Sequence, residues 1–236
     1  MIFAAGTGSR LKDETQTKPK ALVEVNGKTL LQNCIEKLKQ VGVDEIVINV
    51  HHFASQIVNY LSENSNFGIK IHISDETDEL LDTGGGLMRA KHFLKDEKHI
   101  FLHNVDIISE INLNEMMKFH IKSGALATVA VKNRETTRKL LFDSENSLSG
   151  WRNLATGEEI ITRISHNHRE LAFSGIHIID YKLFELIKNT GKFSIFKAFL
   201  DLSDDYKITS FVHDNDSWLD VGKPETLEQA RQLTFL

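Results

Sequence analysis

The stretch that decides the fold is Ala4-Ala5-Gly6-Thr7-Gly8-Ser9-Arg10-Leu11, which follows the apolar pair Ile2-Phe3. A glycine-rich turn directly after a first strand lets backbone N–H groups approach phosphate oxygens without an intervening Cβ atom. The dinucleotide-binding fingerprint requires a third glycine where this chain has Leu11, so the turn does not match it. On Gly6 and Gly8 alone, a flexible strand-end turn is as good an interpretation as a phosphate-binding loop.

Beyond this turn, the chain up to residue 131 alternates short apolar runs with helical patterns. Besides the strand over 2–5, we expect strands over 45–50, 69–73, 99–103 and 125–131, and helices over 28–41, 54–61, 83–93 and 112–121. Such alternation predicts an α/β fold, a Rossmann-like, doubly wound and mostly parallel sheet with helices on both faces.

The pattern changes after Lys132. Residues 140–164 resemble antiparallel hairpins, and they are followed by expected strands over 173–179 and 207–212 and helices near 182–188, 195–200 and 225–233. We therefore expect one domain over residues 1–236, in which a small β-rich lid is inserted into the second half. The division between the two halves falls between residues 131 and 132.

Composition narrows the class of protein. Apolar residues make up 41% and charged residues 26% of the 236 residues, as in ordinary globular enzymes. The net charge of −5 disfavours non-specific nucleic-acid binding, and no apolar run approaches the length of a membrane span. A single cysteine, Cys34, and the lack of a signal-peptide pattern lead us to expect a cytoplasmic protein with no membrane partner.

Four elements near the start carry a resemblance. They are Ala4-Ala5-Gly6 with Gly8, Arg10-Leu11, Pro19-Lys20, and the turn Val25-Asn26-Gly27-Lys28. In this order and spacing they resemble the opening of the sugar nucleotidyltransferases (NDP-sugar pyrophosphorylases), which join a nucleoside triphosphate to a sugar 1-phosphate. Asp13 departs from the family, which often has proline there.

The resemblance continues through four later segments. Leu81–Gly86 is similar to the segment that meets the nucleotide base, and His103–Asp106 to the metal-aspartate motif. Phe173–Ile176 is similar to a strand that touches the sugar, and Trp218–Gly222 to the segment with the second metal aspartate. Two departures are Asp82 and Val105, which each replace a frequent glycine. No hexapeptide-repeat extension follows, so we do not expect a bifunctional acetyltransferase.

The resemblance assigns roles to individual residues. Those implied for catalysis are Arg10 at the β- and γ-phosphates, Lys20 at the α-phosphate, and Asp106 and Asp220 as ligands of Mg²⁺, which prefers oxygen ligands. Those implied for binding are Ala5, Gly6, Gly8, Thr83 and Gly84 at the nucleotide and Asn104 and Gly175 at the sugar. Glu79, in an acidic run and three residues before Asp82, is a further candidate at the nucleotide base. An aspartate after a strand is otherwise often a helix cap. The metal role expected for Asp106 therefore depends on its pairing with Asp220. The family's cation for the sugar phosphate has no clean match, which leaves Arg152 or Arg163 as guesses.

Within the family, the chain is most similar to N-acetylmuramate 1-phosphate uridylyltransferases, which share the Thr-Gly-Gly-Gly, Asn-x-Asp and Phe-Ser-Gly-Ile segments. Mannose 1-phosphate guanylyltransferases and phosphocholine cytidylyltransferases remain alternatives, as does a non-catalytic sugar-nucleotide sensor on the same fold. We expect backbone N–H groups of Thr83-Gly84-Gly85 to donate to O4 of uracil and so to favour UTP over CTP. The expected partners are the two substrates, with the chain a monomer or a small homo-oligomer.

Overall fold

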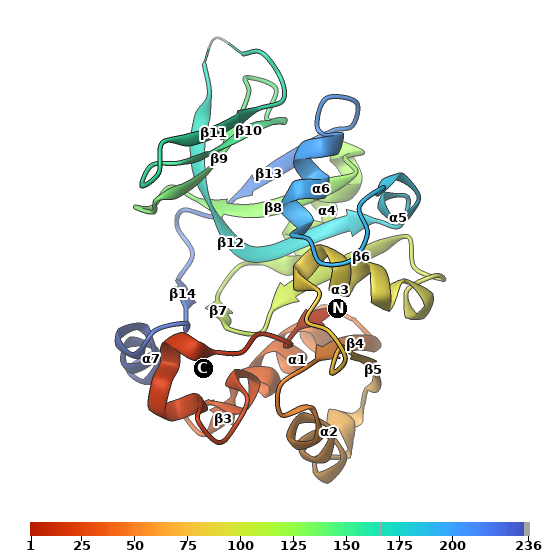
Figure 1. Cartoon of the computed structure of the whole chain (residues 1–236), viewed down its shortest axis with the longest axis vertical. Helices are drawn as coiled ribbons and strands as arrows, with labels where there is room; N and C mark the ends of the chain where they lie inside the picture. Colours follow the sequence, from red (N-terminus) through yellow and green to blue (C-terminus); the bar gives the residue numbers. More distant parts are fainter. Residues whose placement is uncertain (166, 234–236) are drawn as a thin grey trace.

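The computed structural model describes residues 1–165 and 167–233, and a ten-stranded sheet runs through these residues (Figure 1). Its strands are β1 (Ile2–Phe3), β4 (Glu45–Val50), β5 (Lys70–Asp75), β6 (His99–Asn104), β8 (Ala127–Lys132), β9 (Arg138–Phe142), β10 (Leu148–Asn153), β11 (Glu158–Ile161), β12 (Arg169–Asp180) and β13 (Ile208–Val212). Eight of them lie in the order β11-β10-β9-β12-β6-β1-β4-β5, while β8 pairs with β12 and β13 pairs with β8.

The central strands β6, β1, β4 and β5, which are adjacent in this order, are parallel to one another. Strand β12 is antiparallel to β6, β8 and β9, and it leads from the central sheet into the antiparallel ribbon of β9, β10 and β11. In Figure 1 this ribbon lies at the top of the molecule, whereas β4 and β5 lie in its lower half, above α2. The expected hairpins over 140–164 thus correspond to β9–β11, whose bounds differ by a few residues.

Helices cover both faces of the sheet, as predicted. They are α1 (Leu30–Gln40), α2 (Ala54–Glu63), α3 (Asp82–Ala90), α4 (Leu113–Ser123), α5 (Leu183–Leu186), α6 (Ile195–Leu202) and α7 (Pro224–Arg231). Because side chains alternate along a strand, Ile46 and Ile48 of β4 pack with α1 and α7 in one core, whereas Val47 packs with α3 and α6 in the other. The α/β class and the mostly parallel central sheet are therefore confirmed.

The first helix begins two residues later than expected, and the reason is local. Asn26 and Gly27 both have positive φ, 53° and 80°, which closes a hairpin of β2 (Glu24–Val25) and β3 (Lys28–Thr29) before the helix. Thr29 then caps α1, since its Oγ1 accepts a hydrogen bond of 3.0 Å from the backbone N–H of Gln32. The sequence pattern of 28–41 did not separate this hairpin from the helix.

Two short strands that the sequence did not predict are important for the site. Strand β7 (Ile107–Ser109) pairs antiparallel with β14 (Trp218–Asp220), which places Asp220 opposite Ile107. The remaining elements are the 3₁₀ turns η1 (Ser9–Thr15), η2 (Lys20–Leu22), η3 (Ser65–Gly68) and η4 (Lys91–Phe93). Within residues 1–165 and 167–233, no helix has the length and apolar character needed to span a membrane.

Candidate active site

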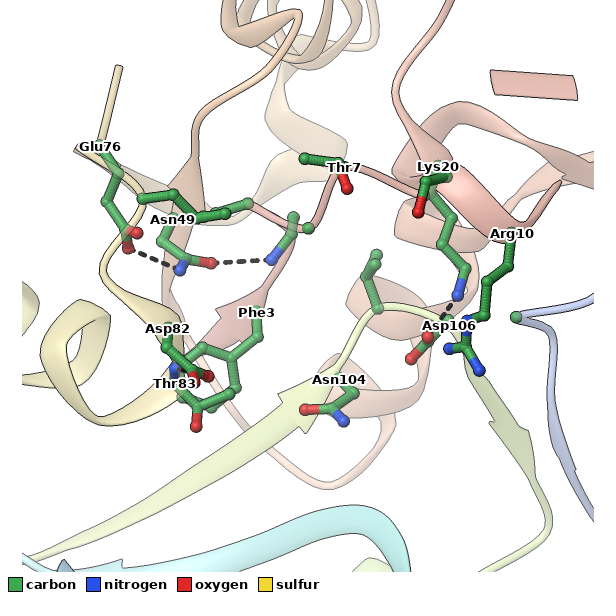
Figure 2. A pocket seen from close by; sticks show the side chains of 18 of the residues that line it. Phe3, Thr7, Arg10, Lys20, Asn49, Glu76, Asp82, Thr83, Asn104 and Asp106 are labelled. Carbon is green, nitrogen blue, oxygen red and sulfur yellow. Dashed lines mark hydrogen bonds and ion pairs between the residues drawn. The ribbon is translucent and has the colours of Figure 1, made fainter. Parts of the chain in front are cut away.

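A cavity of about 450 Å³ opens where β1, β4 and β6 end, the edge at which α/β sheets commonly bind ligands (Figure 2). One end is formed by the glycine-rich turn and the segment after β6, and the other by the segments after β4 and β5. Its lining includes Ala5, Gly6, Gly8, Arg10, Lys20, Asn49, Glu76, Asp82, Thr83, Asn104, Asp106, Lys192 and Gly222. Eight of the predicted site residues, Ala5, Gly6, Gly8, Arg10, Lys20, Thr83, Asn104 and Asp106, are thereby brought together.

The glycine-rich turn is held in a conformation that only Gly8 allows at its centre. Gly8 has a φ of +65°, and a Cβ atom there would lie 3.0 Å from Cβ of Lys20 and 3.1 Å from Cγ2 of Thr15. Gly6 is different, because nothing lies within 4 Å of the position of its missing Cβ. The turn is therefore packed against the protein at Gly8 and open toward the cavity at Gly6, as a loop that meets phosphate should be.

Lys20 and Asp106 form an ion pair at one end of the cavity, although 86 residues separate them in the chain. Lys20 is only 8% exposed and begins the turn after Pro19, while Asp106 follows directly after β6. Figure 2 shows Arg10 beside this pair, with its guanidinium directed to the same region. The predicted catalytic cations and Asp106 thus share one end of the cavity.

Asp220 reaches the same place from the end of β14. The backbone N–H of Val221 donates to the carbonyl of Asp106 at 2.8 Å, which ties the two acidic segments together. The position that a Cβ of Gly222 would take lies 2.6 Å from Oδ1 of Asp220, 2.9 Å from Nη2 of Arg10 and 3.2 Å from Nζ of Lys20. Three charged groups therefore converge on one point.

The Asp220 carboxylate shows signs of a missing partner. Burial raises the pKa of Asp220, and the negative charge of Asp106 raises it further. Oδ1 of Asp220 is buried and accepts no hydrogen bond from the described residues. A buried carboxylate oxygen without a donor, beside a second carboxylate, fits a hard divalent cation such as Mg²⁺. The described residues contain no cluster of three or more such ligands, so substrate oxygens and water would complete the coordination.

The other end of the cavity is a closed hydrogen-bond network. Asn49, at the end of β4, accepts from the backbone N–H of Ala4 at 2.8 Å and donates to Oε1 of Glu76 at 2.7 Å. The second carboxylate oxygen of Glu76 accepts from the N–H of Leu81 at 3.1 Å. Glu76 is completely buried, and both bonds of Asn49 are visible in Figure 2. This network fixes the start of the glycine-rich turn relative to α3.

The three glycines of α3 do not have the role expected for them. The N–H groups of Gly84 and Gly85 both donate to the carbonyl of Phe193, at 2.9 and 3.2 Å, and that of Thr83 donates to Oδ1 of Asp82. A Cβ at Gly84 would lie 2.3 Å from the Phe193 ring. The expectation that these N–H groups read O4 of uracil is therefore wrong, because they are already paired. Gly84 and Gly85 instead allow α3 to pack closely against the segment before α6, whereas a Cβ at Gly86 would meet Oε1 of Glu76 at 2.5 Å.

Four predicted residues lie outside the cavity lining. Glu79 is exposed, and the buried Glu76 takes the place expected for it; Gly84 packs behind the cavity. Gly175 has a φ of +79° and its missing Cβ would lie 3.4 Å from Nδ2 of Asn104, so the two predicted sugar residues are neighbours. Asp220 reaches the site beside Gly222, as described above.

Sequence reasoning also missed residues that the cavity contains. Asn49, Glu76 and Lys192 carried no motif, and only their position at the ends of β4 and β5 and before α6 gave a signal. The guesses for the phosphate cation are placed elsewhere. Arg152 pairs with Glu159 and Glu170, and Arg163 lies 3.6 Å from Asp143.

Comparison with known proteins agrees with this geometry. A family model described as nucleotidyl transferase matches residues 1–140. A bifunctional protein GlmU of Methanocaldococcus jannaschii is 30% identical over 237 residues, which cover 98% of this chain and 53% of that protein. An N-acetylmuramate alpha-1-phosphate uridylyltransferase of Caulobacter vibrioides is 40% identical over 110 residues, 46% of this chain and 45% of that protein. The chain spans about half the length of these relatives.

The fold has well-matched counterparts among solved structures. A putative glucose-1-phosphate thymidylyltransferase of Bacillus anthracis, in complex with a sucrose, superposes with a TM-score of 0.80. The match covers 100% of this chain and 96% of that chain at 19% sequence identity. At 19% identity the likeness establishes only that the fold is shared. The assignment to a family rests on the family model that matches residues 1–140.

Proposed function

Because this chain belongs to the nucleotidyl transferase family, we propose that it joins a nucleoside triphosphate to a sugar 1-phosphate and releases pyrophosphate. The observation that carries this proposal is the convergence of Arg10, Lys20 and Asp220 on one point, with Asp106 paired to Lys20, beside the open glycine-rich turn. A site for phosphoryl chemistry needs such a set of cations, carboxylates and free backbone donors.

The chemistry proposed for the site requires no strong base. A phosphate monoester is already largely dianionic at pH 7, since its second pKa is about 6. One of its oxygens attacks the α-phosphorus, the bond from that phosphorus to the bridging oxygen of the β-phosphate breaks, and pyrophosphate leaves with the electron pair. The chain's own residues align the reactants and stabilise charge, Arg10 and the turn at the leaving phosphates and Lys20 at the α-phosphate. When bound between Asp106 and Asp220, Mg²⁺ would neutralise phosphate charge.

At a finer level, the proposed substrates are UTP and N-acetylmuramate 1-phosphate. Support comes from the Caulobacter relative, whose name states this activity, and from the Thr83–Gly86 segment that the chain shares with such enzymes. Mannose 1-phosphate with GTP, and phosphocholine with CTP, are the alternatives. In each case residues 1–131 would serve the nucleotide, and residues 132–236 would serve the acceptor and supply the closing helix.

A substrate panel tests the proposal. Each of the four nucleoside triphosphates is combined with N-acetylmuramate 1-phosphate, mannose 1-phosphate, glucose 1-phosphate or phosphocholine in the presence of Mg²⁺, and pyrophosphate release is measured. On the likeness to the Caulobacter relative, we expect UTP to be used better than CTP and N-acetylmuramate 1-phosphate to be the best acceptor. Equal or better turnover with CTP or GTP would overturn the finer assignment. Nucleotide binding without pyrophosphate release under any combination would favour the sugar-nucleotide sensor.

A further inference from the structure

One arginine beside the candidate metal carboxylates is not explained by the roles assigned so far. Arg134 lies just after β8 and is half-buried. Its guanidinium carbon lies 4.5 Å from the centre of the Trp218 ring, and its Nη2 donates to the carbonyl of Phe173 at 3.0 Å. The Trp218 indole is itself fixed, because its Nε1 donates to the carbonyl of Ser174 at 2.8 Å. Stacking on a fixed ring holds the guanidinium plane in one orientation.

The position of Trp218 relates Arg134 to the reacting groups. Trp218 and Asp220 are two residues apart on β14, so their side chains project from the same face about 7 Å apart. Arg10 and Lys20 lie near Gly222, beyond the other end of this strand. Burial lowers the pKa of Arg134, and the charge of Asp220 partly opposes that effect, which is consistent with their proximity. Asp220 therefore has cations on both sides along β14.

Most hydrogen-bond donors of Arg134 have no recorded acceptor among the described residues. A guanidinium carries five N–H donors, and within the described residues the only recorded acceptor is the carbonyl of Phe173. Its Nε is buried and has no partner among those residues. A buried donor atom without an acceptor costs free energy unless a ligand supplies one. The planar fork of arginine matches two oxygens of a phosphate.

We propose that Arg134 binds the phosphate of the acceptor substrate, opposite Arg10 and the glycine-rich turn at the leaving pyrophosphate. The inference rests on the proposed function. An in-line displacement requires the attacking and leaving oxygens on opposite sides of the α-phosphorus. Arg10 lies beyond one end of β14, near Gly222, and Arg134 stacks on Trp218 at the other end, an arrangement that suits this requirement. Arg134 would hold the attacking monoester while its oxygen forms the new bond to the α-phosphorus, and no proton has to move.

The test compares Arg134→Gln and Arg134→Met with a matched control. Arg138→Gln removes an exposed arginine four residues further along the chain. Initial rates of pyrophosphate release are measured with the acceptor varied at saturating triphosphate, and then with the triphosphate varied. For both Arg134 variants we expect the acceptor KM to rise about tenfold or more and the triphosphate KM to stay within about twofold. The control should leave both constants at the wild-type values.

Further outcomes separate binding from a purely structural role, in which Arg134 only holds the carbonyl of Phe173. That role predicts a lower thermal midpoint and equal changes in the two KM values, and this result would overturn the inference. Two variants are made because Met keeps an apolar contact with Trp218 if Gln disturbs the fold. A further variant, Arg134→Ala, leaves room for added guanidinium, which at millimolar concentration should restore part of its activity; failure of rescue in a folded protein counts against the proposal. If the wild type releases no pyrophosphate with any acceptor, the proposed function itself fails.

Discussion

At one end of the cavity Arg10, Lys20 and Asp220 converge beside Asp106, and a buried oxygen of Asp220 accepts no hydrogen bond from the described residues. At the other end Asn49 and Glu76 form a network in which each buried oxygen has a donor. The first end has charges that a ligand would satisfy, whereas the second is complete without one. We infer that the first end does chemistry and that the second provides a rigid wall of fixed shape.

The largest expected effect is at the charged end. Asp106→Asn and Asp220→Asn should each lower turnover at least about a hundredfold, because each removes a charged ligand for Mg²⁺. Pyrophosphate release at saturating substrates measures this effect. Asp220→Asn should barely change thermal stability, since burial and the neighbouring carboxylate already raise the pKa of Asp220, whereas Asp106→Asn also removes the ion-pair partner of the buried Lys20 and should lower it. In a thermal melt, Mg²⁺ should stabilise the wild type and have less effect on either variant. Near-normal activity of either variant with Mg²⁺ would show that the metal assignment is wrong.

A smaller effect is expected for Lys20→Ala. Its proposed role is to meet charge that develops at the α-phosphate, so kcat should fall about tenfold to a hundredfold, with a smaller rise in the triphosphate KM. Lys18→Ala is the matched control, because Lys18 is an exposed lysine of the same segment whose ion pair is with Glu14 at 3.9 Å. Weaker triphosphate binding with unchanged kcat would show that Lys20 binds the triphosphate in the ground state and does not stabilise the transition state.

The contrast between the two ends also explains what the sequence could predict. Lys20 and Asp106 stand in short segments, Pro19-Lys20 and His103–Asp106, that resemble motifs of the family, so they were found although 86 residues separate them. The parallel strands and the two-sided helices were predicted from periodicity for a similar reason, because both signals are local. The roles proposed for these residues still await the experiments above.

Asn49 and Glu76 could not be found in this way. Asn49 looks like one polar residue in the strand Glu45–Val50, and only the folded sheet places its amide between Ala4 and Glu76. Glu79 was preferred to Glu76 for its distance from Asp82 along the chain. In the structure the N–H of Glu76 donates to the carbonyl of Val50 at 2.8 Å, which continues the edge of the sheet and buries Glu76, while Glu79 stays exposed.

The smallest expected effect is a change in the free energy of unfolding, and it distinguishes Glu76 from Glu79. Glu76→Gln replaces one of two accepting oxygens by an NH₂ group, which must then face either Nδ2 of Asn49 or the N–H of Leu81. Asn49 cannot turn its amide over, because its Oδ1 accepts from Ala4. One buried donor is left unpaired, at a cost of about 1–3 kcal/mol in the free energy of unfolding.

Glu79→Gln is the control for this prediction, and it should change the free energy of unfolding by less than about 0.5 kcal/mol, as exposed substitutions generally do. Thermal and urea denaturation of both variants measure the difference. The triphosphate KM should rise modestly for Glu76→Gln, because Asn49 positions the start of the glycine-rich turn through Ala4. If Glu76→Gln is as stable as the wild type, or if Glu79→Gln is equally destabilised, this end of the cavity is not the rigid wall inferred from its hydrogen bonds.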